Sequence, residues 1–148
     1  MKRIVTIITV LIAVCDALMA QPAAVKNAAK SVFTLTTFKA DGSLLASGHG
    51  VFIGADGEAI SNLTPFIWAA SAVVIDARGN KMNVTRMLGA NSIYDVAKFK
   101  VDGKTVAASV ASSAASAGTQ VWLVPYSVKT PAVKSATVRN VETFMDKY

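Results

Sequence analysis

The chain has 148 residues, of which 53% are hydrophobic, and its formal net charge is +6 at pH 7. This length is enough for one modest domain that buries about two-thirds of the surface of its unfolded chain. The lysines and arginines are scattered along the sequence and do not alternate with aromatic residues. This distribution indicates a solvated surface and argues against a stacking platform for nucleic acid.

The first twenty residues have the pattern of a secretory signal peptide. They begin with M-K-R, continue with residues 4–14, which are apolar residues and threonine, and end with A-L-M-A at Ala20. The apolar run is shorter than the roughly 20 residues that a membrane-spanning helix needs. We therefore expect residues 1–20 to be a signal peptide, the protein to be exported to the periplasm or beyond the cell, and no stable insertion into a membrane.

Cys15, the only cysteine, lies directly behind the apolar run, where a bacterial lipoprotein carries its lipidated residue. The branched residue Val14 stands before it, whereas a lipobox has Gly, Ala or Ser at that position. Removal of the peptide is therefore the preferred interpretation, and lipid anchoring through Cys15 is the alternative. Removal leaves a chain without a disulfide framework, a thiol nucleophile or a cysteine-ligated metal.

From residue 31 onward, apolar and polar residues alternate with the two-residue period of β-strands. Asp-Gly dipeptides at 41–42, 56–57 and 102–103 and the tripeptide Arg-Gly-Asn at 78–80 predict tight turns. In the last segment Ala97, Phe99 and Val101 are predicted to face inward. We predict an all-β fold whose first part is a small closed barrel or sandwich, with strands at residues 33–36, 44–54, 58–62, 72–77, 82–88 and 97–101.

Beyond these strands the composition changes to a run of small residues, T-V-A-A-S-V-A-S-S-A-A-S-A-G, at 105–118. After this connector two further strands are predicted, at 120–124 and 135–143. Two strands alone do not form a stable sheet, so they either pack on the first unit or begin a second one. The expected domains are a first barrel at 31–104, the connector at 105–118 and the incomplete start of a second barrel at 119–148. Trp68 and Trp122 are expected in the core of the barrel or of an interface.

Three segments give the chain a resemblance to a known family. These are G-H-G-V-F-I-G-A-D-G-E-A-I-S-N-L-T-P-F at 48–66, A-N-S-I-Y-D-V-A-K-F-K-V at 90–101 and A-G-T-Q-V-W-L-V-P-Y-S at 117–127. They resemble, in order, segments of the trypsin-like serine proteases of the HtrA (Deg) type. The resemblance implies the chymotrypsin fold of two six-stranded β-barrels, with the first barrel complete here and the second only begun.

The same resemblance places two residues of a catalytic triad. Asp95 stands where the family has its catalytic aspartate, at the start of a strand. Thr64 stands at the histidine position, because the family's T-N-x-H corresponds to S-N-L-T at 61–64. A hydroxyl cannot shuttle protons near neutral pH as an imidazole does, so Thr64 is not competent as the base. His49, the only histidine, is expected to be an ordinary strand residue, although a meeting with Asp95 in the fold stays open.

The family's nucleophile motif G-[ND]-S-G-G has no counterpart before Tyr148, and Ser112, Ser113 and Ser116 lack its flanking glycines. The leading expectation is an exported protease homologue that is inactive as written. Its partner would be a peptide or protein, with no cofactor and no metal. The alternative is a non-catalytic β-barrel module of the cell envelope that binds a peptide or protein, for example by adding a strand to a sheet edge. A third possibility is an incomplete product whose family function is lost.

Overall fold

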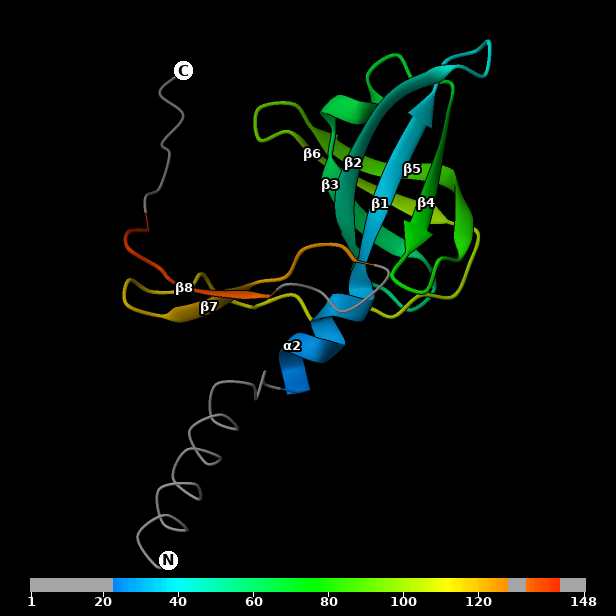
Figure 1. Cartoon of the computed structure of the whole chain (residues 1–148). Helices are drawn as coiled ribbons and strands as arrows, with labels where there is room; N and C mark the ends of the chain where they lie inside the picture. Colours follow the sequence, from blue (N-terminus) through cyan, green and yellow to red (C-terminus); the bar gives the residue numbers. More distant parts are fainter. Residues whose placement is uncertain (1–22, 128–132, 142–148) are drawn as a thin grey trace, which may run out of the picture.

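The computed structural model describes residues 23–127 and 133–141, and within them the fold is all-β with one short α-helix (Figure 1). The expected signal peptide and Cys15 lie outside the described residues. Six strands form a closed barrel and two form a separate hairpin. The strands are β1 (Val32–Phe38), β2 (Leu44–Phe52), β3 (Glu58–Asn62), β4 (Ser71–Asp76), β5 (Lys81–Asn91), β6 (Val96–Val101), β7 (Gln120–Leu123) and β8 (Lys134–Thr137).

The barrel is antiparallel throughout, in the order β1-β2-β3-β6-β5-β4, with β4 closing back onto β1. Consecutive strands pair except where β3 pairs with β6 and β4 with β1. The prediction of an all-β fold with a closed first barrel is therefore confirmed, and the barrel is compatible with a chymotrypsin-like one. Closure leaves each of its strands with a neighbour on both sides.

The core lies inside the barrel and follows the predicted alternation. Phe33 and Leu35 are fully buried, and Ala97, Phe99 and Val101 face inward as expected. The ring of Phe33 packs 4.5 Å from that of Phe52 and 6.0 Å from that of Phe99, measured between ring centroids. Because burying one such side chain is worth about 1.5–3 kcal/mol, these rings are a main source of the barrel's stability.

The chain reverses at 41–42, 56–57 and 78–80 where the sequence predicts turns, whereas Asp102-Gly103 forms only a bend after β6. Gly57, in the turn before β3, has a φ of 99°, and a Cβ there would stand 2.6 Å from the carbonyl oxygen of Val101. In the turn before β5, the carboxylate of Asp76 accepts hydrogen bonds from the backbone nitrogens of Arg78 and Asn80 at 2.8 and 2.9 Å. Glycine and aspartate thus fix the two reversals that bring β3 and β5 back onto the barrel.

The connector and the residues directly after β7 are attached to the barrel. Thr105 donates a hydrogen bond from its hydroxyl to the carbonyl oxygen of Gly54 at 2.6 Å, and the Ala108 nitrogen donates to the Phe52 oxygen at 2.8 Å. Beyond β7, the Tyr126 hydroxyl donates to the Asp76 carbonyl oxygen at 3.4 Å. The segment directly after β7 therefore contacts the first unit, while β7 and β8 pair with each other in a sheet of their own.

Several expectations need correction. β8 ends at Thr137, and residues 138–141 of the predicted strand are not strand, because the pairing with the four-residue β7 stops at Gln120 and Thr137. Residues 142–143 of that prediction lie outside the described residues. Trp68 is 88% exposed and therefore not in the barrel core, since it lies in the loop after β3 with a left-handed φ of 67°. Trp122 is also partly exposed, on the hairpin.

A short helix before the barrel was not predicted. It is α2 (Ala23–Ala28), which continues into the 3₁₀ turn η1 (Ala29–Ser31) and leads directly into β1. Its Val25 is buried, so packing rather than intrinsic helix stability holds this single short segment. Across the part of the chain that the structure describes, no helix has the length and apolar character needed to cross a membrane.

Candidate functional site

The two residues singled out from the sequence meet at one place on the barrel. Asn62 ends β3 and pairs with Val96, the first residue of β6. Directly after β3 the chain forms the 3₁₀ turn η2 (Thr64–Phe66), and directly before β6 it passes through Asp95. The β3–β6 pairing therefore brings Thr64 and Asp95 together although they are 31 positions apart.

Three hydrogen bonds converge on the Asp95 carboxylate. Its Oδ1 accepts one from the backbone nitrogen of Thr64 at 2.6 Å and one from the Thr64 hydroxyl at 2.8 Å. Its Oδ2 accepts one from the side-chain amide of Asn62 at 2.8 Å. In addition, the backbone nitrogen of Leu63 donates to the main-chain oxygen of Asp95 at 3.1 Å. The turn after β3 and the residue before β6 are thus tied by both side chain and backbone.

Asp95 holds a backbone conformation that supports this arrangement. Its φ is 51°, in the left-handed region that aspartate and asparagine visit more readily than most residues. Such a conformation is costly unless the surroundings hold it, and here the Asn62 and Thr64 bonds do so. In this conformation the carboxylate contacts the end of β3 and the turn that follows it.

The turn that carries Thr64 is itself anchored on the barrel. The fully buried Thr37 of β1 donates a hydrogen bond from its hydroxyl to the carbonyl oxygen of Pro65 at 2.7 Å. Pro65 is buried and lies against β2, where a Cβ at Gly48 would be 3.3 Å from its ring. The Phe66 ring packs edge-on against that of Phe99, with centroids 5.1 Å apart. Thr64 is therefore positioned by the core, while its own side chain stays exposed.

The hydrogen bonds also decide the charge of the site. The Asn62 amide, followed by the Thr64 hydroxyl and the Thr64 backbone nitrogen, lowers the pKa of Asp95 below its ordinary value. At neutral pH the group is a carboxylate that only accepts hydrogen bonds. The site consists of an anion, a hydroxyl and an amide, and none of these exchanges a proton near neutral pH.

His49 does not complete this arrangement. It is exposed on β2, and its ring stacks on that of Tyr126 with centroids 6.0 Å apart and planes inclined by 26°. Among the described residues no hydrogen bond or ion pair joins His49 to Asp95. The structure therefore answers the question that the sequence left open, and the only imidazole lies outside the Asp95 network.

The remaining candidates for catalytic or metal-binding roles are the serines of the connector and clusters of metal-ligating side chains. Ser112, Ser113 and Ser116 are exposed in the connector. No cluster of three or more His, Cys, Asp or Glu side chains that could hold a metal ion occurs within residues 23–127 and 133–141.

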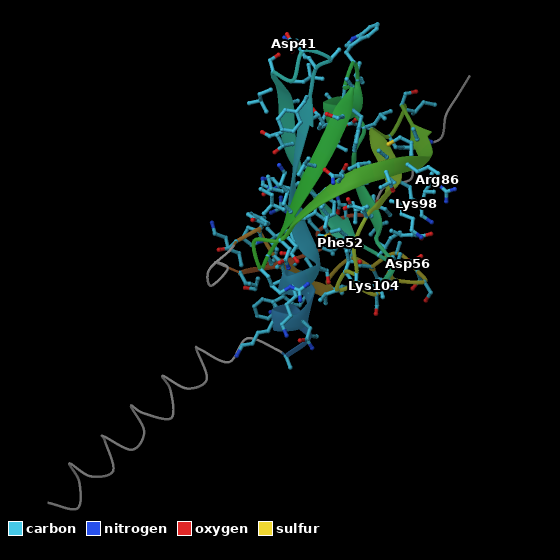
Figure 2. The ribbon with its side chains drawn as sticks, turned by 90° about the vertical axis from the view of Figure 1, so that its right-hand side faces the viewer. Asp41, Phe52, Asp56, Arg86, Lys98 and Lys104 are labelled. Carbon is cyan, nitrogen blue, oxygen red and sulfur yellow. The ribbon has the colours of Figure 1, made fainter. Side chains whose placement is uncertain are left out.

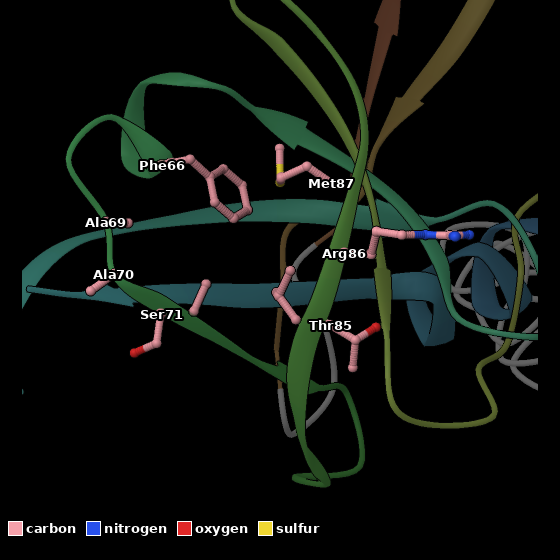
Figure 3. Close-up of a pocket in the computed structure, with 9 residues that line it drawn as sticks. Phe66, Ala69, Ala70, Ser71, Thr85, Arg86 and Met87 are labelled. Atoms are coloured by element: carbon pink, nitrogen blue, oxygen red, sulfur yellow. The ribbon is translucent and has the colours of Figure 1, made fainter. Parts of the chain in front are cut away.

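A pocket of about 180 Å³ lies beside the site without including it. Residues 69–72 and 84–87 form its two walls, and Phe66 closes one end (Figure 3). Thr64 and Asp95 do not line it. Sequence reasoning missed this pocket, and it missed Asn62 as a partner of Asp95, although Asn62 belongs to the same S-N-L-T segment as Thr64. The sequence did contain a signal for Asn62. A polar residue at the end of one strand lies close to the first residues of the antiparallel strand that pairs with it, here Asp95 and Val96.

Comparison with known proteins gives no family assignment. No model of a known protein family matches the chain, and no curated protein matches it either.

Proposed function

We propose that this chain is an exported homologue of the trypsin-like serine endopeptidases of the HtrA (Deg) type and that it does not hydrolyse peptide bonds. The observation that carries the proposal is the pair of hydrogen bonds from Thr64 to Oδ1 of Asp95. In a Ser-His-Asp triad the aspartate accepts a hydrogen bond from the histidine and stabilises the imidazolium. Thr64 satisfies the aspartate in that place but supplies no base.

The family part of the proposal is supported by the order of the motifs in the fold. The segments at 48–66 and 90–101, which resemble the protease family, supply β2, β3 with the Thr64 turn, and β6 with Asp95. They lie together in a closed antiparallel barrel of a kind compatible with the chymotrypsin fold. The basic, apolar start of the sequence supports export to the periplasm or beyond.

Hydrolysis of casein and of fluorogenic peptides tests the proposal. We expect the purified protein to give no turnover above the buffer rate, because no imidazole contacts Asp95. The matched control is Asp102, whose carboxylate likewise accepts hydrogen bonds from the backbone nitrogen and side-chain amide of one residue, Asn83, at 2.7 and 2.8 Å. Hydrolysis that disappears in Asp95→Ala and persists in Asp102→Ala would show an active protease and refute the proposal.

A second proposal is a non-catalytic module of the cell envelope that binds a peptide or protein. It is favoured by large apolar side chains that are exposed: Ile93 and Tyr94 directly precede Asp95, and Trp68 lies in the loop that follows the Thr64 turn. Contiguous exposed apolar groups, such as the neighbouring Ile93 and Tyr94, are typical of interaction surfaces. Saturable binding to an envelope protein that weakens in Trp68→Ala would support this role, and binding unaffected by Trp68→Ala would speak against these loops.

A further inference from the structure

The wall of the barrel is incomplete between β4 and β5. Their ladder consists of the pairs Val73–Asn83, Val74–Met82 and Ile75–Lys81, and it stops there. β4 nevertheless begins at Ser71, and β5 continues to Asn91. Over these stretches β4 is paired with β1 and β5 with β6, each on its other side. Each strand thus has one edge that the opposite strand does not cover.

The 180 Å³ pocket occupies this opening. Its walls are the end of β4 with the preceding loop, residues 69–72, and the uncovered part of β5, residues 84–87. Figure 3 shows the Phe66 ring and the Met87 side chain pointing toward each other across the space. The wall formed by residues 69–72 carries the small side chains of Ala69 and Ala70. A cavity of about 150 Å³ with apolar walls accommodates a benzene ring, so this one has room for a large apolar side chain.

Two bulges on β5 determine which of its side chains face the pocket in this region. The pairing with β6 shifts at Thr85 and again at Leu88, which places Met87 opposite Phe99 and Arg86 opposite Lys100. Met87 therefore lies on the same face of the sheet as Phe99 and lines the pocket, although it is 42% exposed, whereas Arg86 points away from the pocket (Figure 3). Bulges of this kind re-aim side chains beside a binding edge.

The charge at this edge is unbalanced. Lys98 pairs with Glu58 at 3.0 Å and Lys100 with Asp56 at 2.7 Å. Arg86, on the neighbouring strand, is exposed and makes no ion pair within the described part of the chain (Figure 2). A second copy of this chain, with or without residues 1–20, also has a positive net charge and would bring positive charge to positive charge. The edge is therefore matched to an acidic partner.

We propose that the opening between β4 and β5 binds an extended peptide in which apolar and acidic residues alternate. This inference rests on the second proposed function, peptide or protein binding, and names its site. The peptide backbone pairs with the uncovered edge of β5, as in β-strand addition. Because side chains of a strand alternate between faces, one apolar side chain enters the pocket beside Phe66 and Met87 while its acidic neighbours face outward toward Arg86.

The experiment measures fluorescence anisotropy of labelled six-residue peptides titrated with the full-length protein. The probe alternates leucine and glutamate, and the comparison peptides alternate leucine and lysine or carry N-methyl groups along one edge. We expect saturable binding of the leucine–glutamate peptide only. N-methylation, which removes backbone donors, should weaken binding about tenfold or more.

Two variants of one strand localise the binding. Arg86→Glu reverses the charge at the uncovered edge, and Lys81→Glu makes the same change where β4 covers β5. Arg86→Glu should weaken binding about fivefold or more, with Lys81→Glu close to wild type. Ala70→Phe, which narrows the pocket at an exposed position, should weaken binding as well. Thermal melts of each variant show that the barrel is intact.

The outcomes separate the site from the function. Failure of the leucine–glutamate peptide to bind overturns the inference, as does equal binding by the leucine–lysine peptide. If Arg86→Glu and Lys81→Glu weaken peptide binding equally, the protein binds the peptide but not at the uncovered edge of β5, and the proposed site is wrong. A concentration-dependent dimer that Arg86→Glu alters would assign the edge to a second copy and overturn the proposal. Mass spectrometry of the same mixtures shows whether the peptide stays intact, and cleavage would contradict the first proposed function independently.

Discussion

At the scale of single residues, the Asp95 carboxylate decides how this site can act. Its two oxygens are occupied by Thr64 and Asn62, and these bonds lower its pKa. A buried or catalytic carboxylate needs such partners to stay ionised and oriented. Here the partners are a hydroxyl, a backbone nitrogen and an amide. They orient the Asp95 carboxylate, but none of them can accept a proton at neutral pH.

The substitution Thr64→His tests whether the position is still shaped for an imidazole. Because the ring would stand beside the ionised Asp95, we expect the pKa of the introduced histidine to rise above its ordinary value of about 6.5. The pKa is measured by NMR titration of the ring protons, with His49 of the same molecule as the internal reference. The shift should vanish in Thr64→His/Asp95→Asn. A pKa that does not respond to Asp95 would mean that the turn no longer directs this side chain toward the carboxylate.

At the scale of elements, the contact among β1, β2 and β3 leaves no room at Gly50. This residue pairs with Phe33 on one side and Ser61 on the other. A Cβ there would stand 2.4 Å from the Phe33 ring and 2.5 Å from the Ile60 carbonyl oxygen. Glycine thus lets the Phe33 ring fill the barrel between these strands.

The substitution Gly50→Ala is therefore expected to destabilise the barrel. Overpacking of this kind typically costs about 1–3 kcal/mol, and the backbone atom at 2.5 Å cannot move aside as a flexible side chain can. The matched control is Gly89→Ala on β5, because a Cβ there meets nothing within 4 Å. The free energy of unfolding in urea measures both changes. A Gly50→Ala variant as stable as Gly89→Ala would contradict the described packing.

At the scale of the whole molecule, aspartates at the turns and strand ends connect stability to pH. Burial by itself would raise the pKa of Asp76, but the hydrogen bonds from Asn80 and Arg78 outweigh it and the net shift is downward. The other carboxylates are bound by neighbouring side chains and backbone nitrogens. The pKa is lowered at Asp41, Asp56, Asp76, Asp95 and Asp102.

These shifts predict acid destabilisation. A carboxyl group whose folded pKa is depressed contributes stability that is fully present above its unfolded pKa, about 3.9, and is lost as the pH falls through its folded pKa. We expect the Tm to be level from neutral pH down to about 5 and to fall below about 4. In Asp76→Asn the Tm should fall less steeply below about pH 4. The substitution removes a buried carboxylate whose hydrogen bonds in the turn before β5 lower its pKa. A Tm that is unchanged between pH 5 and pH 2 would contradict the assignment.

The sequence by itself determined the all-β class, the positions of the six barrel strands and the turns at Gly42, Gly57 and Gly79. These follow from local signals, namely the two-residue alternation around Phe33 and Phe99 and the need for glycine where φ is positive. It also predicted that Thr64 occupies the place facing Asp95, although only through a resemblance of motifs. That the two residues touch depends on the pairing of β3 with β6.

Only the tertiary structure decided which groups surround these positions. Asn62 joins Asp95, His49 instead stacks on Tyr126, and Trp68 is exposed, and each outcome depends on how strands distant in sequence come together. The opening between β4 and β5 follows from where their ladder stops, a property of two strands and their bulges that no local pattern records. Local alternation sets which face of a strand is buried, whereas long-range pairing sets what each exposed edge and side chain meets.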